Sequence, residues 1–160
     1  MRHGKAQERS SNITSDAKRT LTYVAKKEIE NIAKSLDVLG MDFDEIISSP
    51  LVRAKQTGEI ILRHSKNKKN LIIWEELKPE TETKETIAKI TTIKSNSVLI
   101  IGHEPLLTDL VSRIIASDSN VNISLKKGGI IHIKRIQDGT RFAGILRSVM
   151  TPKQLKKICK

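Results

Sequence analysis

The chain has 160 residues, of which 38% are hydrophobic, and this size suits a single domain covering residues 1–160. No apolar run approaches the roughly 20 residues that a membrane helix needs, so we expect no membrane partner. Lys and Arg outnumber Asp and Glu by 29 to 18, which favours anionic partners such as phosphates or acidic protein surfaces. With one Trp, one Tyr and two Phe, the chain lacks the stacking platform of single-strand binders, and we expect no nucleic-acid partner.

The first residues and the cysteine content indicate a compartment and exclude some kinds of site. Residues 1–7 lead into a polar segment rather than the apolar stretch of a secretory signal, so the sequence predicts a cytoplasmic protein. The single cysteine, Cys159, has no partner for a disulfide or a cysteine metal cluster. His64 and His132 lack the paired spacing of metal ligands, and we expect no metal and no cofactor.

Segments with helical and with strand periodicity alternate along the chain. Apolar residues at three- and four-residue steps predict a first helix over 16–39, which Gly40 ends. The run 43–47, closed by a Ser-Ser-Pro turn, predicts a short strand. The same patterns then predict helices over 51–64, 85–93, 105–116 and 151–160, and strands over 70–74, 97–102, 128–136 and 141–149.

This order of elements predicts one α/β domain. Alternating strands and helices form a largely parallel sheet. The last two strands are joined by a tight turn at Asp138-Gly139, so they add an antiparallel end to the sheet. The sequence shows no internal repeat and no linker rich in Pro, Gly or Ser.

Candidate site residues follow the predicted strands. Ligands of open parallel sheets bind beyond the carboxyl ends of the strands. Arg53 follows the Ser-Ser-Pro turn, His103 directly follows the strand over 97–102, and Arg2, His3 and Gly4 form a triplet at the start of the chain. A neutral imidazole is a competent nucleophile, and a guanidinium matches the oxygens of a phosphoryl group. The set therefore suits phosphoryl transfer through a covalent intermediate.

Four motifs in this order resemble one family. They are RHGKA at 2–6, RTLT at 19–22, SSPLVRAKQT at 48–57 and IGHEP at 101–105, and they extend over most of the chain. The sequence resembles the histidine phosphatase superfamily, and within it the short SixA-like phosphohistidine phosphatases. The resemblance implies a three-layer α/β/α fold with a mostly parallel mixed sheet, as in phosphoglycerate mutase.

The resemblance also implies roles for individual residues. His3 would be the nucleophile that is phosphorylated, and Arg2, Arg53 and His103 would form the phosphate pocket. Arg19 matches a family position near the pocket and would contact phosphate or substrate. Independently of the resemblance, Gly4 has no side chain and would let the backbone approach the phosphate closely. Larger members of the superfamily carry a proton-donating carboxylate after a strand, and the candidates here are Glu75, Glu76 and Glu80, of which we select Glu76.

The opening of the chain departs from the family pattern. In the family, a strand of about five apolar residues leads into the RHG motif, whereas here only Met1 and Arg2 precede His3. Most of the first strand would then be missing. The explanation that we favour is that Met1 is an internal methionine taken as the start of the chain. The alternative is that the chain has lost its first strand.

The leading interpretation is a metal-independent phosphatase that removes phosphate from a histidine of a signalling or phosphotransfer protein. A second interpretation is a phosphatase of small phosphate esters, which would need a carboxylate near the site. A third is a non-catalytic module that binds phosphate or a phosphoprotein. The sequence does not indicate an oligomeric state.

Overall fold

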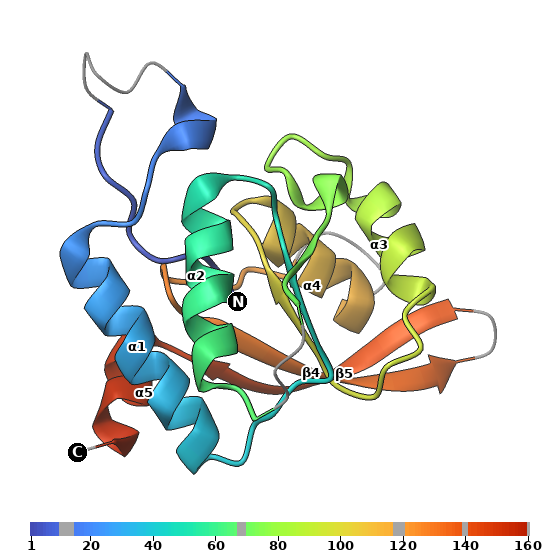
Figure 1. The fold of residues 1–160 in the computed structure, drawn as a ribbon. Coiled ribbons are helices and arrows are strands. Elements are labelled where there is room, and N and C mark those ends of the chain that lie inside the picture. The colour runs from blue at the N-terminus through green and yellow to red at the C-terminus, as the bar shows by residue number, and fades with distance from the viewer. Residues whose placement is uncertain (10–14, 67–69, 117–120, 139–140, 160) are drawn as a thin grey trace.

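The structure, a computed structural model, describes residues 1–9, 15–66, 70–116, 121–138 and 141–159 (Figure 1). No helix in these ranges is long and apolar enough to cross a bilayer. The elements are the short 3₁₀ helices η1 (Asp16–Lys18) and η2 (Glu75–Leu77), the helices α1 (Tyr23–Val38), α2 (Val52–His64), α3 (Thr83–Thr91), α4 (Leu106–Ala116) and α5 (Pro152–Ile158), and the strands β1 (Glu45–Ser48), β2 (Ile72–Ile73), β3 (Val98–Ile101), β4 (Ile130–Asp138) and β5 (Arg141–Met150).

The strands form a parallel part and an antiparallel part, as predicted. In the parallel part the order is β2-β1-β3, and β4 pairs with β5 antiparallel. Neighbouring side chains of β1 point to opposite faces, so that Ile46 joins one apolar core and Ile47 the other. Each face of this short strand is therefore covered, which is typical of parallel strands between two helical layers.

Helices cover both faces of the parallel sheet, and the predicted three-layer α/β/α arrangement is confirmed. One core contains side chains of α1, α2 and α5 packed on β1 and β3. The other contains Ile90 of α3 and Leu110 and Ile114 of α4, packed with Trp74 and Leu77. Figure 1 shows α1 beside α2, with α5 against α1, while α3 and α4 lie together on the other side.

The first three residues join the two parts of the sheet. Arg2 forms a parallel bridge with Gly102, directly after β3. On its other side, the Arg2 amide donates to the carbonyl of Gly129 (3.0 Å), and the amide of Gly128 donates to the carbonyl of Arg2 (3.0 Å). Residues 1–3 thus occupy the place of a strand between β3 and β4, and His3 stands at the carboxyl end of the sheet.

An apolar cleft of about 250 Å³ lies beside Met1. Its walls include Ile100 of β3 and Ile131 of β4, so the cleft continues the line of residues 1–3 between these two strands. The amino group of Met1 donates to the carbonyl of Ile100 (2.7 Å), and burial lowers the pKa of this amine to about 5. The proposed origin of the short opening stays a prediction.

A five-residue apolar segment joined in front of Met1 is expected to raise the melting temperature. The added side chains would fill the cleft at about 25 cal/mol per Å² of apolar surface removed from water, and an amide would replace the buried amine. Differential scanning fluorimetry of the extended chain, beside one extended by five Gly and Ser residues, measures the effect. Equal melting temperatures for the two extensions would contradict it.

The first predicted helix is longer than the observed one. The predicted range 16–39 divides into η1, an extended stretch over 19–22, and α1. The extended stretch pairs with the start of the chain, since the Gln7 amide donates to the Thr20 carbonyl (2.8 Å) and the Thr22 amide to the Lys5 carbonyl (3.0 Å). Thr22 then caps α1 by accepting from the amide of Ala25. Periodicity could not reveal this interruption, because pairing with a distant segment causes it.

The other predicted elements agree with the structure within a few residues. Gly40 adopts a positive φ of 67° just after α1, which is the conformation that lets a glycine end a helix. The strand expected over 70–74 is reduced to the two residues of β2. The tight turn expected at Asp138-Gly139 lies partly outside the described residues.

Candidate active site

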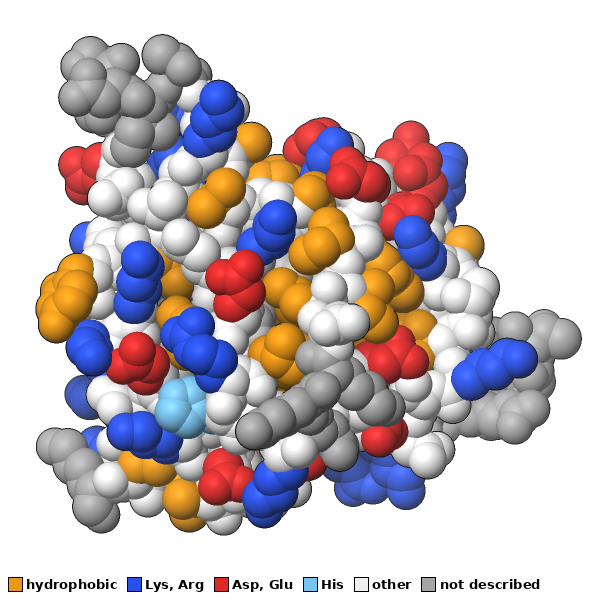
Figure 2. All heavy atoms as spheres, in the orientation of Figure 1, with side chains coloured by type: hydrophobic (Ala, Val, Ile, Leu, Met, Phe, Trp, Pro, Cys, Tyr) orange, Lys and Arg blue, Asp and Glu red, His pale blue; other side chains and the backbone are white. Residues whose placement is uncertain are grey.

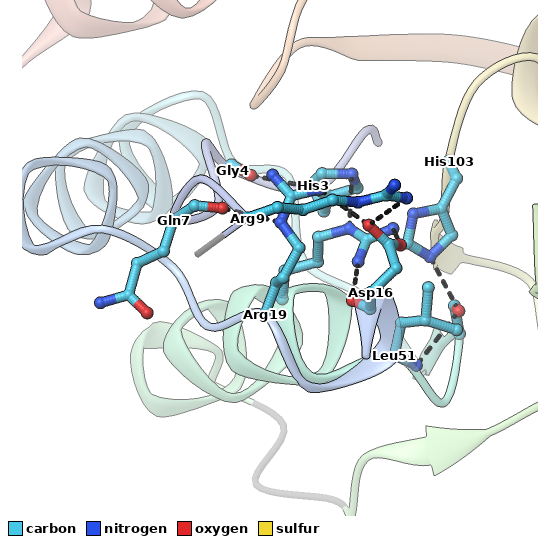
Figure 3. Close-up of polar contacts among 10 residues, drawn as sticks. His3, Gly4, Gln7, Arg9, Asp16, Arg19, Leu51 and His103 are labelled. Carbon is cyan, nitrogen blue, oxygen red and sulfur yellow. Dashed lines mark hydrogen bonds and ion pairs between the residues drawn. The ribbon is translucent and has the colours of Figure 1, made fainter. Parts of the chain in front are cut away.

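The structure brings the three predicted clusters together at the carboxyl ends of β1 and β3. His3 comes from the start of the chain, Arg53 from the first turn of α2, and His103 from the turn after β3. Their side chains are buried, with 6%, 6% and 2% of their surfaces exposed. The rings of the two histidines lie with their centroids 4.8 Å apart. Figure 3 shows them facing a group of arginines.

One ring nitrogen of His3 carries an unprotonated lone pair. Its Nδ1 lies 2.6 Å from the carbonyl oxygen of Gly4, and its Nε2 lies 3.2 Å from the Arg53 Nε. A guanidinium can only donate, so Nε2 accepts from Arg53 and the ring proton is on Nδ1. Burial, followed by the charges of Arg53 and Arg2, lowers the pKa of His3 to about 4. The ring is therefore neutral at pH 7, with Nε2 beside the guanidinium of Arg53.

His103 is neutral as well. Its Nε2 lies 2.9 Å from the hydroxyl of Ser49, and this hydroxyl also accepts from the amide of Leu51. When the hydroxyl proton is directed to Nε2, the ring proton is on Nδ1, which is then a donor. Burial, with His3 and Arg53 nearby, lowers the pKa of His103 to about 3.

Buried polar atoms without a partner gather at this place. Within the described residues these atoms are Arg2 Nε, His103 Nδ1 and Glu104 Oε1. The Arg2 side chain is held by a bond from Nη1 to the carbonyl of Leu125 (2.9 Å), which leaves Nε unused. The Arg2 Nε–H, together with His103 Nδ1 in the tautomer that carries its proton there, can bind the oxygens of an anion, and such unsatisfied groups are rare in protein interiors.

Arg53 and Arg19 share a carboxylate that the sequence analysis did not select. Asp16 accepts from Arg53 Nη2 at 2.9 Å and from Arg19 Nη1 at 2.8 Å (Figure 3). Its hydrogen bond to Arg19 and the nearby Arg53 lower the pKa of Asp16 to about 2. Arg19 also donates from Nε to the carbonyl of Gln7 (2.7 Å). The predicted Arg19 thus lies next to Arg53, joined to it through Asp16.

Gly4 lies next to the site for a reason of packing. Its amide donates to the Thr57 hydroxyl (3.2 Å), which donates to the Arg53 carbonyl (2.7 Å), so the opening of the chain is tied to α2. A Cβ at Gly4 would come within 3.1 Å of side-chain atoms of both Ile29 and Leu21. The structure therefore shows a packing role for Gly4, and the expected close approach of its backbone to phosphate stays a prediction.

The predicted acid, Glu76, is engaged elsewhere. Its carboxylate accepts from the amine of Lys89 on α3 at 2.6 and 2.7 Å, and this bond lowers its pKa. The hydrogen bonds of Glu76 lead to Thr86 and Lys89 of α3, so the role of acid finds no support in this geometry.

Lys127 adds a further cation near the pocket. Burial, followed by the positive charges of Arg2, Arg19, Lys5 and Arg53, lowers the pKa of its amine. On the face of the molecule in Figure 2, by contrast, Lys and Arg are mixed with Asp and Glu. Positive charges that lower the pKa of Lys127 mark a locally positive pocket.

Comparisons with known proteins agree with this geometry. Residues 1–82, which contain three of the four motifs, match the sequence profile of the histidine phosphatase superfamily (branch 1). The chain belongs to this superfamily. An uncharacterised protein of Picosynechococcus sp. (strain ATCC 27264 / PCC 7002 / PR-6) is 29% identical to this histidine phosphatase over 136 residues, which cover 83% of this chain and 81% of the relative.

Solved structures of SixA proteins have the same fold as this histidine phosphatase. The protein histidine phosphatase SixA in complex with tungstate superposes with a TM-score of 0.83 at 25% identity, over 97% of this chain and 96% of that one. A putative phosphohistidine phosphatase SixA of Agrobacterium tumefaciens superposes with a TM-score of 0.74 at 21% identity, over 89% and 93% of the two chains. The phosphoglycerate-mutase-like fold and the SixA-like resemblance are confirmed, and with them a phosphatase of this superfamily.

Proposed function

We propose that residues 1–160 form one catalytic domain that removes phosphate from a phosphohistidine of another protein. The observation that carries this proposal is the state of His3, whose Nε2 lone pair lies beside Arg53 while Nδ1 is bound to the Gly4 carbonyl. A fixed tautomer with an unprotonated Nε2 is what a nucleophilic imidazole requires. The likeness to SixA structures supports the choice of substrate.

The reaction has two steps. In the first, Nε2 of His3 attacks phosphorus in line and forms a P–N bond, while the P–N bond of the substrate breaks and its electron pair stays on the departing imidazole. In the second, water attacks the phosphorus of phosphorylated His3, and inorganic phosphate and neutral His3 are released. Arg2, Arg53 and Nδ1 of His103 donate to the phosphoryl oxygens in both steps.

The protonation states favour an imidazole over an alkoxide as the leaving group. An imidazole can leave with a proton on its second nitrogen, whereas an alkoxide needs a proton from an acid. Asp16, the carboxylate in contact with the arginines, has a pKa of about 2 and carries no proton at neutral pH. This argues against phosphate esters as preferred substrates. The mechanism uses arginine charges and assigns no step to a metal.

A trapping experiment tests the proposal. The chain is mixed with a protein labelled with ³²P on histidine, and the reaction is stopped with alkaline denaturant, which preserves P–N bonds. We expect label on His3, located by peptide mapping, followed by release of inorganic phosphate. His132→Ala, a change on exposed β4, serves as the matched control and should label normally. Label that is bound but never transferred would support a binding module instead.

Replacing Lys127 by Ala is expected to reduce kcat/KM for an acidic phosphoprotein by about three- to tenfold, mainly through KM. Its charge adds to the attractive field at the mouth of the pocket without contacting the nucleophile. Steady-state kinetics at low and high salt measure this, and the loss should shrink at high salt. The neighbouring exposed Lys126→Ala is the control. An equal loss for both variants would contradict a specific role of Lys127.

A further inference from the structure

Arg53, central to the proposed site, already binds an anion of its own chain. Its Nε donates to His3 Nε2 (3.2 Å), its Nη1 to the backbone carbonyl of Asp16 (2.8 Å), and its Nη2 to the carboxylate of Asp16 (2.9 Å). The other oxygen of this carboxylate accepts from Arg19 (2.8 Å). The Asp16 carboxylate thus bridges the guanidinium groups of Arg53 and Arg19, and the guanidinium of Arg53 also contacts the proposed nucleophile His3.

A phosphoryl group on His3 would need the same donors. A group attached to Nε2 stands where the Arg53 Nε–H now points, and its oxygens would be within reach of the Arg53 nitrogens. The Asp16 carboxylate also acts on the second histidine, since its charge raises the proton affinity of His103. A doubly charged phosphoryl group and this carboxylate would repel each other at such short range.

The carboxylate is able to leave while its residue stays in place. The Asp16 side chain is one-third exposed, at 33%, whereas that of Arg53 is 7% exposed. Arg9, whose side chain is 76% exposed, already lies 3.5 Å from the carboxylate on the outer side. The backbone carbonyl of Asp16 can keep its bond to Arg53 when the side chain turns outward. Figure 3 shows Asp16 reaching toward the arginines from the side of the site.

We infer that Asp16 is an internal anion that the phosphoryl group displaces from Arg53 and Arg19, and that it thereby lowers the affinity of the pocket for every anion. This inference rests on the proposed function. The cost of displacing the carboxylate is the same for every anion that takes its place, whatever the charge of that anion. Asp16 therefore weakens the binding of all anions by one common factor.

The inference is tested by binding, without turnover. Tungstate and perrhenate are tetrahedral oxyanions of similar size that carry two charges and one. Isothermal titration calorimetry measures both with the unmodified chain, with Asp16→Asn, and with Asp37→Asn. The last variant removes the same charge from α1, where Asp37 pairs with Lys66. Melting curves confirm that all three chains are folded.

With Asp16→Asn we expect the Kd of both anions to fall by about tenfold and by similar factors, because the cost of displacement is removed for each. Asp37→Asn should leave both Kd values within about twofold. A much larger gain for tungstate than for perrhenate would mean that Asp16 stays in place and only repels, which overturns displacement. Unchanged or weaker binding would overturn it too, since Asp16 would then only hold the arginines.

The outcome is independent of the substrate. If the chain fails to dephosphorylate phosphohistidine yet both anions bind more tightly to Asp16→Asn, the proposed function fails and the role of Asp16 stands. If phosphohistidine is hydrolysed and Asp16→Asn binds anions no better, the role of Asp16 fails alone.

Discussion

Replacing His3 by Ala is expected to lower kcat/KM for a phosphohistidine protein at least about a thousand-fold, because the covalent route requires its Nε2. Arg2, Arg53 and His103 would remain, so the Kd of tungstate should change by less than about tenfold. This separates a nucleophile from a residue that only binds phosphate. Stopped-time assays of phosphate release, together with calorimetry, measure the two effects.

The control for this substitution is His132→Ala, since that side chain is exposed on β4. His3 is buried, and its loss leaves a space next to His103, so a melting curve must show that the variant is folded at the assay temperature. A folded His3→Ala chain with activity within tenfold of the original would refute the covalent mechanism. Loss of tungstate binding in step with activity would assign His3 to binding alone.

Much of the site was predictable because strand ends are readable in the sequence. The Ser-Ser-Pro turn fixes where β1 ends, and the glycine after the apolar run 98–101 fixes where β3 ends. In a parallel sheet these ends meet at one edge, so Arg53 and His103 had to be neighbours. The position of His3 followed from the family motif alone, since no predicted strand precedes it.

Asp16 could not be found in the same way. Its place in the site depends on the extended stretch 19–22, which pairs with residues 5–7, and such long-range pairing has no periodic signature. A helix continued back to residue 16 would have placed this carboxylate on a helix surface. The one available signal was its position three residues before Arg19, which is an ordinary spacing for a salt bridge on a helix.

Lys127 and Glu76 also show that the sequence does not predict where a side chain points. Lys127 reaches the pocket because the next two residues, Gly128 and Gly129, pair with Arg2. Glu76 follows a strand of the sheet, as the proposed acid should, yet its side chain turns to Lys89. Sequence position gives the edge of the sheet at which a residue lies, whereas the direction of its side chain depends on partners far along the chain.

The stability of the protein is expected to fall steeply as the pH is lowered from about 6.5 to 4. His3 and His103 have pKa values of about 4 and about 3 in the folded chain, chiefly because of burial, against an ordinary value of 6.5. Below pH 6.5 the two histidines therefore bind protons in the unfolded chain but not in the folded chain. The stabilisation is complete above pH 6.5 and is lost as the pH falls through the folded pKa values.

The expected loss is large compared with the stability of a domain. A pKa difference of this size corresponds to on the order of 3 kcal/mol for His3 alone, against a total of about 5 to 15 kcal/mol. The Met1 amine, with a pKa of about 5 against 8.0, acts in the same direction between pH 8 and 5. Its contribution is separable because it begins above pH 6.5, where the histidines contribute nothing.

Urea unfolding at a series of pH values from 8 to 4 measures this profile. His3→Gln and His103→Gln should each flatten the pH dependence of the free energy of unfolding below pH 6.5, because a glutamine side chain does not titrate in this range. The control His132→Gln should leave the profile unchanged. The two rings lie 4.8 Å apart, so protonation of one opposes protonation of the other. The double variant should consequently remove less than the sum of the single effects. If His3→Gln and His103→Gln leave the profile below pH 6.5 as unchanged as His132→Gln does, the fold does not hold the site histidines neutral.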